Sequence, residues 1–218
     1  MNRSKLWRIY SDAFEHMRQE HPDDLRWAKG LSVATFRKQS SNAFMAEYAW
    51  VVYAAGFRVS TLRLKWPALR KAYGAFRLEY VAGMKSMARV LKVFNNPRKA
   101  RSVIEGAGLI SSEGFKAFKR RMSSEGAEGL LQLPGIGPIT KDHLARNIGL
   151  AATGKGDIWI VRIARAVGTT DWIEMLAYVS RRARLSPGTV DIIFWEFCAD
   201  NAWRTLGYRS FSSYVRSR

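Results

Sequence analysis

Cysteine is almost missing from this sequence, and Cys198 is the single example in 218 residues. One cysteine excludes a disulfide within the chain and any metal site built on four cysteines. Cys198 follows the largely apolar run Ile192–Phe197, so we interpret it as a small buried residue and not as a nucleophile. His16 and His21 lie in the N-terminal segment with no His/Cys/Asp cluster nearby, and we therefore expect no metal site.

Acidic residues are also scarce, since 18 Asp and Glu stand against 36 Lys and Arg, which gives a formal net charge of +18. The basic residues are scattered through the periodic segments and are not gathered in a tail. A folded domain this positive repels itself unless a polyanion offsets the charge, which makes nucleic acid the leading partner. The alternative interpretation is a generally basic, solvated surface.

Long apolar runs are absent as well. No run reaches the roughly 20 residues of a membrane-spanning helix, and the segment Met1–Trp7 lacks the apolar core of a secretory signal. We therefore expect no membrane partner and no secretion. Internal repeats, low-complexity tracts and Pro- or Ser-rich linkers are missing too, and 47% hydrophobic residues suffice for one sizeable core or two small lobes.

What the sequence does contain is helical spacing of apolar residues along almost its whole length, which predicts an all-α protein. We expect the first helix to begin near Ser4 and to end before Pro22. A long helix should carry Phe44 and Ala55 and stop at Gly56.

Further helix boundaries follow from proline and capping residues. Pro67 should separate two helices, and one further helix should run over Val81–Val93. The pairs Asn96-Pro97 and Ser186-Pro187 each combine a capping side chain with a proline at the first helical position, which predicts two more helix starts.

The most informative segment is Leu133–Thr140, which reads Leu-Pro-Gly-Ile-Gly-Pro-Ile-Thr. Two glycines around one apolar residue make a tight turn whose N–H groups can point outward, and Pro138 then opens a helix. Such a turn holds a phosphate through unpaired amides and the positive end of the helix dipole. It binds a nucleic-acid backbone without reading its sequence. Gly-Ile-Gly alone is also found in ordinary turns between helices.

This segment resembles the helix-hairpin-helix of the DNA glycosylases related to endonuclease III, whose hairpin reads Leu-Pro-Gly-(Val or Ile)-Gly. In that family a catalytic Asp follows about one helix and one loop later, and Asp157 occupies that place here. The resemblance implies two helical lobes with a cleft between them. Residues 31–150 would form a barrel-like lobe with the hairpin, and residues 1–30 and 151–218 the second lobe. Many members also carry a four-cysteine iron–sulfur cluster, which this chain cannot hold.

The resemblance gives Asp157 the catalytic role. Removing a base from a nucleotide passes through a transition state with oxocarbenium character, which a carboxylate beneath the sugar stabilises. The structural alternative is that Asp157 caps the helix that follows it. Both roles are compatible, because a carboxylate at a helix start is held rigidly by the same amides.

A second position divides the family. Members that also cleave the strand carry a Lys two places after the second hairpin glycine, where its amine forms a Schiff base with the sugar. Ile139 holds that position here, which implies a monofunctional glycosylase. Lys141 lies two residues further on, roughly 200° around the helix. We interpret Lys141 as a phosphate contact or solvated surface, and strand cleavage through it stays open as a weak activity.

The resemblance also assigns DNA contacts. The turn residues Gly135, Ile136 and Gly137 would hold a phosphate, and the Thr140 hydroxyl would donate to it. His143 follows on the same helix as a phosphate-side or packing residue. No cofactor is implied apart from a monovalent cation at the hairpin.

Base flipping needs one group to fill the gap in the duplex and another to hold the extracted base. By position in the family, Phe57 would act as the wedge and Arg58 would read the orphan base, although Phe57 fits core packing equally well. Trp159 would stack on the flipped base or pack between the lobes.

The sequence thus favours a DNA glycosylase that flips a damaged, mismatched or modified base from double-stranded DNA and hydrolyses its N-glycosidic bond. We expect a monomer in the cytoplasm, associated with the nucleoid. Two alternatives remain: a non-catalytic helix-hairpin-helix DNA-binding protein, and a glycosylase-like enzyme that processes hypermodified bases.

Overall fold

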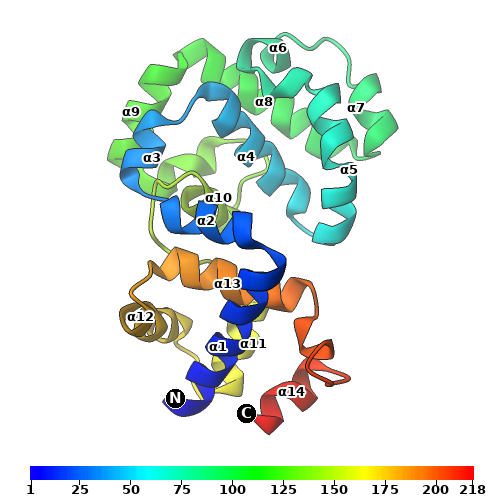
Figure 1. Cartoon of the computed structure of the whole chain (residues 1–218). Helices are drawn as coiled ribbons and strands as arrows, with labels where there is room; N and C mark the ends of the chain where they lie inside the picture. Colours follow the sequence, from blue (N-terminus) through cyan, green and yellow to red (C-terminus); the bar gives the residue numbers. More distant parts are fainter. The chain divides into compact units, whose positions relative to one another are not determined.

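The computed structural model describes all 218 residues, and every regular element in it is a helix (Figure 1). The chain forms 14 α-helices, three short 3-10 helices and no β-strand, which confirms the predicted all-α class. None of these helices combines the length and the apolar composition that crossing a bilayer requires.

The chain divides into two compact units, each with its own hydrophobic core. Unit 1 comprises Met1–Leu31 and Ala152–Arg218, and unit 2 comprises Ser32–Ala151. The lobe boundaries expected from the sequence lie one residue away from these. Unit 1 contains α1 (Arg3–Glu20), α2 (Pro22–Gly30), α11 (Ile158–Ala166), α12 (Trp172–Ala183), α13 (Pro187–Ala199), η3 (Ala202–Arg204) and α14 (Phe211–Ser217). Unit 2 contains α3 (Val33–Lys38), α4 (Ser41–Ala54), α5 (Val59–Ala72), η1 (Gly74–Phe76), α6 (Leu78–Ala82), α7 (Ala88–Val93), α8 (Pro97–Glu113), α9 (Phe115–Glu125), η2 (Gly126–Gln132) and α10 (Pro138–Asn147).

The core of unit 1 is built around α13, which is buried on all sides. A helix that is apolar all round has to be enclosed by others, and α13 packs against α1, α2, α11 and α12. It begins where the sequence predicts, because the Ser186 side chain accepts the N–H of Thr189 and Pro187 fills the first helical position.

The core of unit 2 is built around α4, which packs against α8 and α10. Its Phe44, Tyr48 and Val52 are buried, and the helix ends at Ala54, two residues before Gly56. Gly56 has φ of +75°, a conformation that glycine adopts without strain. The predicted long helix with its stop at Gly56 is therefore confirmed.

The helix starts predicted from capping residues are confirmed, with small shifts. The Asn96 side chain accepts the N–H of Lys99 at the start of α8. In unit 1, α1 starts at Arg3, one residue earlier than expected, because Asn2 caps it. It ends at Glu20, and Pro22 then opens α2, a helix that was not expected from the apolar spacing.

Two predicted boundaries in unit 2 are wrong. Pro67 does not separate two helices but lies inside α5, where it removes one backbone donor while Leu62 and Leu69 stay buried on either side of it. The expected single helix over Val81–Val93 is two helices, α6 and α7. Gly83 follows the end of α6, and the Ser86 hydroxyl accepts the N–H of Ala88 at the start of α7.

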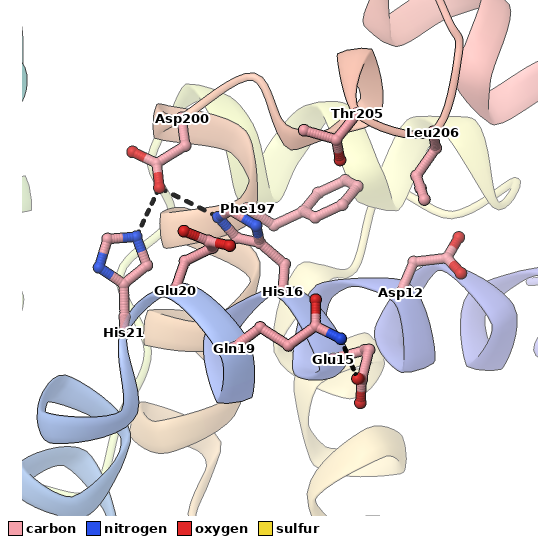
Figure 2. Close-up of a pocket in the computed structure, with 10 residues that line it drawn as sticks. All are labelled: Asp12, Glu15, His16, Gln19, Glu20, His21, Phe197, Asp200, Thr205 and Leu206. Carbon is pink, nitrogen blue, oxygen red and sulfur yellow. Dashed lines mark hydrogen bonds and ion pairs between the residues drawn. The ribbon is translucent and has the colours of Figure 1, made fainter.

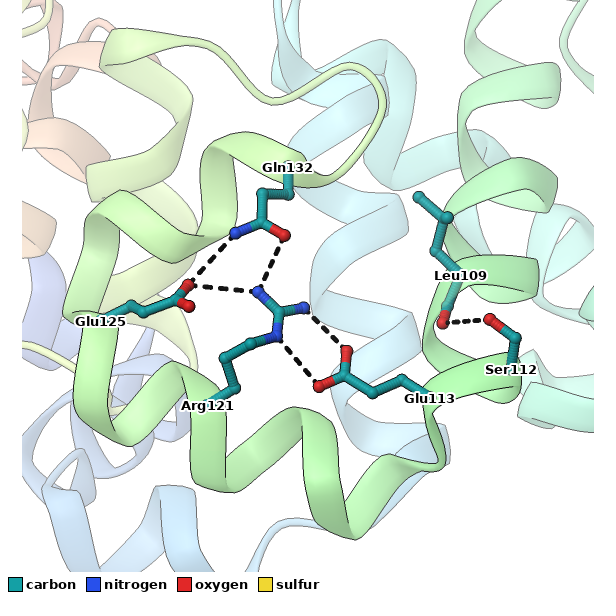
Figure 3. A network of polar contacts seen from close by, with 6 residues as sticks. All are labelled: Leu109, Ser112, Glu113, Arg121, Glu125 and Gln132. Carbon is teal, nitrogen blue, oxygen red and sulfur yellow. Dashed lines mark hydrogen bonds and ion pairs between the residues drawn. The ribbon is translucent and has the colours of Figure 1, made fainter.

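A polar network in unit 2 holds the segment that leads into the glycine turn (Figure 3). The Arg121 guanidinium on α9 donates two hydrogen bonds to the Glu113 carboxylate at the end of α8, at 2.9 and 2.7 Å. It also donates to Glu125 and to the side-chain oxygen of Gln132, at 3.1 and 2.9 Å. Because Gln132 ends η2 and directly precedes Leu133, this network joins α8, α9 and the start of the turn.

Candidate functional site

The glycine turn between η2 and α10 is a closed, tightly packed structure. Gly135 has φ of +81°, and the N–H of Ile136 closes the turn on the carbonyl of Leu133 at 3.0 Å. A Cβ on Gly135 would lie 3.1 Å from Ser102 of α8. Both the backbone conformation and the close approach to α8 therefore require glycine at this position.

Tyr48 anchors the turn to the core of unit 2. Its hydroxyl lies 2.6 Å from the carbonyl oxygen of Pro134 and 2.8 Å from that of Ser102. Burial raises the pKa of Tyr48 well above its usual range, so the phenol stays neutral and keeps the proton that it donates. The ring crosses α8 at Gly106, where a Cβ would overlap the hydroxyl. The position of the turn thus depends on an aromatic residue of α4 and a glycine of α8.

The amides of the turn are partly used within it. The N–H of Gly137 donates to the Thr140 hydroxyl oxygen at 2.7 Å, and that hydroxyl donates back to the Gly137 carbonyl at 3.2 Å. The expected phosphate contacts of the Ile136 and Gly137 amides and of the Thr140 hydroxyl are therefore made within the protein. The N–H of Lys141 donates to the carbonyl of Gly137 at 2.9 Å. Pro138 has no N–H, so the amides of Ile139 and Thr140 precede the first hydrogen bond of the α10 ladder. These two amides form the positive end of α10, and the Ile139 side chain beside them is 57% exposed.

Two other predicted residues of α10 have partners in the protein. Lys141 forms an ion pair with Glu128 of η2. The hydrogen bond from Lys141 to Glu128 raises the pKa of this ammonium above its ordinary value, so the amine stays protonated. His143 is buried in unit 2, which leaves little of its surface for direct contact with a phosphate.

The predicted wedge residues lie between α4 and α5. The Phe57 side chain is 45% exposed, and its ring centroid lies 5.0 Å from that of Phe94 and 5.1 Å from the Lys99 ammonium. Arg58 is exposed and precedes the first residue of α5. One part of the Phe57 surface therefore packs on the protein while the other part meets solvent.

Asp157 is the N-cap of α11 in unit 1, as the sequence predicts. Its Oδ1 accepts the N–H groups of Trp159 and Ile160 at 2.9 and 3.1 Å. Its Oδ2 lies 3.2 Å from the Nζ of Lys155, and the Asp157 side chain is 15% exposed. The carboxylate is thus fixed from two directions and still reaches the surface of the unit.

Lys155 is the residue of this site that sequence reasoning missed. Its side chain is only 8% exposed, and its Nζ lies 5.0 Å from the ring centroid of Trp195. The backbone N–H of Lys155 donates to the Asp191 carboxylate at 3.0 Å. The signal that could have found it is the pattern Gly154-Lys155-Gly156-Asp157, two glycines around a lysine directly before the predicted acid.

The two glycines of this pattern are explained by packing. A Cβ on Gly156 would lie 2.7 Å from the indole of Trp172, and a Cβ on Gly154 would overlap Leu176. Neither residue has a positive φ, so space and not backbone conformation selects glycine. This close packing against α12 fixes the loop that carries Lys155 to Asp157.

Trp159 packs within unit 1. Its ring centroid lies 5.7 Å from that of Trp203 and 5.8 Å from that of Phe211. The Arg162 guanidinium stacks over the same indole at 4.9 Å. Cys198 is buried, as predicted, and burial and the charge of Asp157 raise the pKa of its thiol well above the ordinary value, which keeps it in the unreactive form.

The interpretation of His16 and His21 as histidines without a cluster is wrong. Both Nε2 atoms contact Asp200, which lies 184 residues after His16 and 179 after His21. The three side chains form a group whose donor atoms could hold a metal ion. Sequence reasoning missed this group because α13 brings Asp200 to the end of α1 only through the packing of unit 1.

The predicted site residues therefore fall into two groups. Unit 2 contains the predicted residues of the turn and of α10, which are Gly135, Ile136, Gly137, Thr140, Lys141 and His143. Another loop of unit 2 carries Phe57 and Arg58, whereas unit 1 contains Asp157 and Trp159. Comparison of the chain with family models, curated proteins and solved structures found no match.

Proposed function

We propose that this chain is a DNA glycosylase in which Asp157 supplies the catalytic carboxylate and the Leu133–Thr140 turn binds a phosphate of double-stranded DNA. The observation that carries the proposal is the environment of Asp157. Two backbone amides and the Lys155 ammonium fix a carboxylate that still meets solvent, and such a preorganised charge is what an oxocarbenium-like transition state needs.

In the proposed reaction the bond between the sugar C1′ and the base nitrogen breaks, and the electron pair leaves with the base. Positive charge develops on the sugar, and the negative charge of Asp157 stabilises it. A water molecule then adds to C1′, its proton is lost to the solvent or the carboxylate, and the base takes up a proton as it departs. Lys155 touches no reacting atom in this scheme and acts as a positioning residue.

The DNA partner is supported by charge and by the turn. The net charge of +18 favours a polyanion, and the first-turn amides of Ile139 and Thr140 provide a place for one phosphate. Phe57 and Arg58 are proposed as wedge and orphan-base contacts, because both side chains are exposed at the start of α5. Trp159 is proposed to face the base through the part of its indole that the core leaves uncovered.

Hydrolysis without strand cleavage is supported by the state of Lys141. A Schiff base requires a neutral amine that is free to reach the sugar, whereas the Lys141 ammonium is engaged in an ion pair with Glu128, which also raises its pKa. Ile139 occupies the position at which the resembled family places its nucleophilic lysine. We therefore propose a monofunctional enzyme that leaves an intact abasic strand.

The test is a base-release assay on duplexes that carry oxidised, alkylated, deaminated, mismatched or naturally modified bases. We expect release from one class of base, with strand scission appearing only after alkali treatment. Mass analysis of the same strands separates base loss from modification of a hypermodified base, which would show as a mass gain or a rearrangement. The proposal is wrong if no duplex of the panel loses a base.

A non-catalytic DNA-binding protein is the second candidate, and one observation favours it. Both carboxylate oxygens of Asp157 already have protein partners, as expected of an acid that only caps a helix. This candidate predicts binding to any duplex that weakens steeply with salt. It also predicts that replacing Asp157 leaves DNA affinity unchanged and that no product forms.

A further inference from the structure

His16, His21 and Asp200 form a cluster on the wall of a cavity of about 510 Å³ in unit 1 (Figure 2). His16 lies in the last turns of α1, His21 directly follows that helix, and Asp200 directly follows α13. The three donor atoms lie within 4.8 Å of one another. Their arrangement is independent of the residues proposed for DNA.

The geometry is that of two imidazoles directed at one oxygen. The Nε2 of His16 lies 3.0 Å from the Oδ2 of Asp200, and the Nε2 of His21 lies 2.5 Å from the same atom. Nitrogen and oxygen ligands around a tetrahedral Zn²⁺ stand at about 2.0–2.2 Å from the ion, which places them roughly 3.3–3.5 Å from one another. The two distances from the histidines to Asp200 would therefore have to widen by about 0.3–1 Å to admit an ion. The two histidine nitrogens lie within 4.8 Å of each other, so their separation needs to change by no more than about 1.5 Å.

The surroundings of the cluster fit a metal site. The side chains of His16 and His21 are 12% and 18% exposed, so each ring is held by the protein with one edge toward the cavity. Behind His21, its Nδ1 lies 3.6 Å from a carboxylate oxygen of Asp24, an ion-pair distance that places a negative charge behind the ring without a hydrogen bond. The His16 ring packs edge-on against Phe197, with the centroids 6.0 Å apart.

The charge of the cavity also favours a cation. Its wall carries four carboxylates, from Asp12, Glu15, Glu20 and Asp200, although basic residues outnumber acidic ones two to one in the whole chain. Asp12 and Glu15 form ion pairs with Arg218 and Arg18, so the negative charge that favours a cation comes from Glu20 and Asp200. The cavity leaves room for water molecules to complete the coordination of an ion.

We propose that His16, His21 and Asp200 bind one divalent transition-metal ion, with Zn²⁺ as the ion tested. Two imidazoles and one carboxylate are a donor set that Zn²⁺ accepts, whereas Mg²⁺ and Ca²⁺ prefer oxygen alone. The ion would join the end of α1 to the end of α13 within unit 1. Binding of this kind stabilises the folded unit, because the unfolded chain has no such site.

The experiment uses the full chain without a histidine tag, stripped with a chelator and then titrated with Zn²⁺ by calorimetry. We expect one equivalent per chain. At a free Zn²⁺ concentration of 100 times Kd, the unfolding temperature should rise by about 5–10 °C. His16→Gln and Asp200→Asn should each weaken binding by about 100-fold or more, since even outer-shell changes cost 10–100-fold. Glu15→Gln, which changes another carboxylate of the same cavity, should bind as the parent chain does.

Nitrogen NMR of the histidine rings tests the same site without any substitution. Addition of Zn²⁺ should shift the Nε2 resonances of His16 and His21 and leave those of His143, the only other histidine, unchanged. The proposal is overturned if no stoichiometric binding occurs, if the His16 and His21 resonances do not move, or if a folded His16→Gln/Asp200→Asn double variant binds Zn²⁺ with parental affinity.

Discussion

The ammonium nitrogen of Lys155 lies 3.2 Å from the Oδ2 of Asp157, and both side chains are largely shielded from solvent. Removing one partner of such a pair leaves the other charge poorly compensated. Asp157 would still accept two backbone N–H groups through its Oδ1. The pair therefore links the loop before α11 to the N-cap of that helix. Asp157 thus has two roles, as the cap of α11 and as the proposed catalytic carboxylate.

Replacement of Lys155 should affect both the cap of α11 and the proposed catalytic role of Asp157. We expect Lys155→Met to lower the free energy of unfolding of unit 1 by about 2 kcal/mol, less than the 3–5 kcal/mol of a fully buried pair, because Asp157 keeps its amide donors and some exposure. Urea unfolding followed by tryptophan fluorescence measures this change. Arg209→Met, an exposed change just before α14 of the same unit, should alter stability by less than about 0.5 kcal/mol. Equal stability of the two variants would contradict the assigned role of Lys155.

The support of the glycine turn by Tyr48 can be tested from α8. A Cβ on Gly106 would overlap the Tyr48 hydroxyl, so Gly106→Ala should displace the ring, loosen the turn and destabilise unit 2 by about 1–3 kcal/mol. Gly108→Ala on the same helix meets nothing within 4 Å, and should leave stability unchanged or raise it by about 1 kcal/mol.

The two glycine variants should also differ in DNA binding. If the turn holds a phosphate, Gly106→Ala should bind a duplex more weakly than Gly108→Ala, and fluorescence anisotropy at fixed salt measures the difference. Parental affinity in a folded Gly106→Ala chain would show that the turn is not a DNA contact.

The network around Arg121 predicts a pH dependence in unit 2. The Arg121 guanidinium lowers the pKa of the Glu113 carboxyl below its ordinary value, so this pair contributes stability above the unfolded pKa of about 4.3. The contribution is lost as the pH falls through the lowered folded pKa. Glu113→Gln should therefore be less stable than the parent chain at pH 7 and equally stable at a pH below that folded value.

Urea midpoints at both pH values check this prediction, with Glu79→Gln as the control. Glu79 lies in α6 of the same unit, outside the network of Figure 3. A stability difference between Glu113→Gln and the parent chain that does not change with pH would contradict the account.

The ion pair of Lys141 with Glu128 predicts that the proposed reaction proceeds without a Schiff base. Because Glu128 raises the pKa of the Lys141 amine, borohydride should trap little or no covalent complex with abasic-site DNA at neutral pH. Lys141→Gln should release bases as the parent chain does. Strong trapping that disappears in Lys141→Gln would instead assign a lyase activity to this residue.

Local signals in the sequence predicted the helix starts well. Asn96, Asp157 and Ser186 each cap the helix that follows them, because a capping side chain and the amides it accepts are only two or three residues apart. The expectation that Pro67 separates two helices is wrong because its outcome depends on long-range packing. Whether a helix survives the loss of one hydrogen bond depends on burial of the residues around it, which the local sequence does not contain.

The candidate sites likewise combine local features that the sequence predicts with long-range contacts that it does not predict. The turn at Gly135 was readable from the sequence, but its support by Tyr48 spans 86 residues. Lys155 stands two residues before Asp157, yet its burial depends on Trp195 of α13. The contact of His16 with Asp200 spans 184 residues. Contacts of this kind arise from packing between helices and leave no pattern in a single sequence.

The most direct test of the catalytic role compares Asp157→Asn with Asp171→Asn. Asparagine caps helices about as well as aspartate, so each variant should keep its cap, at Asp157 on α11 and at Asp171 on α12. Asp171→Asn should unfold within a few degrees of the parent chain, whereas Asp157→Asn, which leaves the Lys155 ammonium without its carboxylate, should stay folded but unfold about 4–8 °C lower. On a duplex from which the parent chain releases a base, single-turnover base release should fall by about 100-fold or more in Asp157→Asn and stay unchanged in Asp171→Asn. Base release at the parental rate by a folded Asp157→Asn chain would contradict the account.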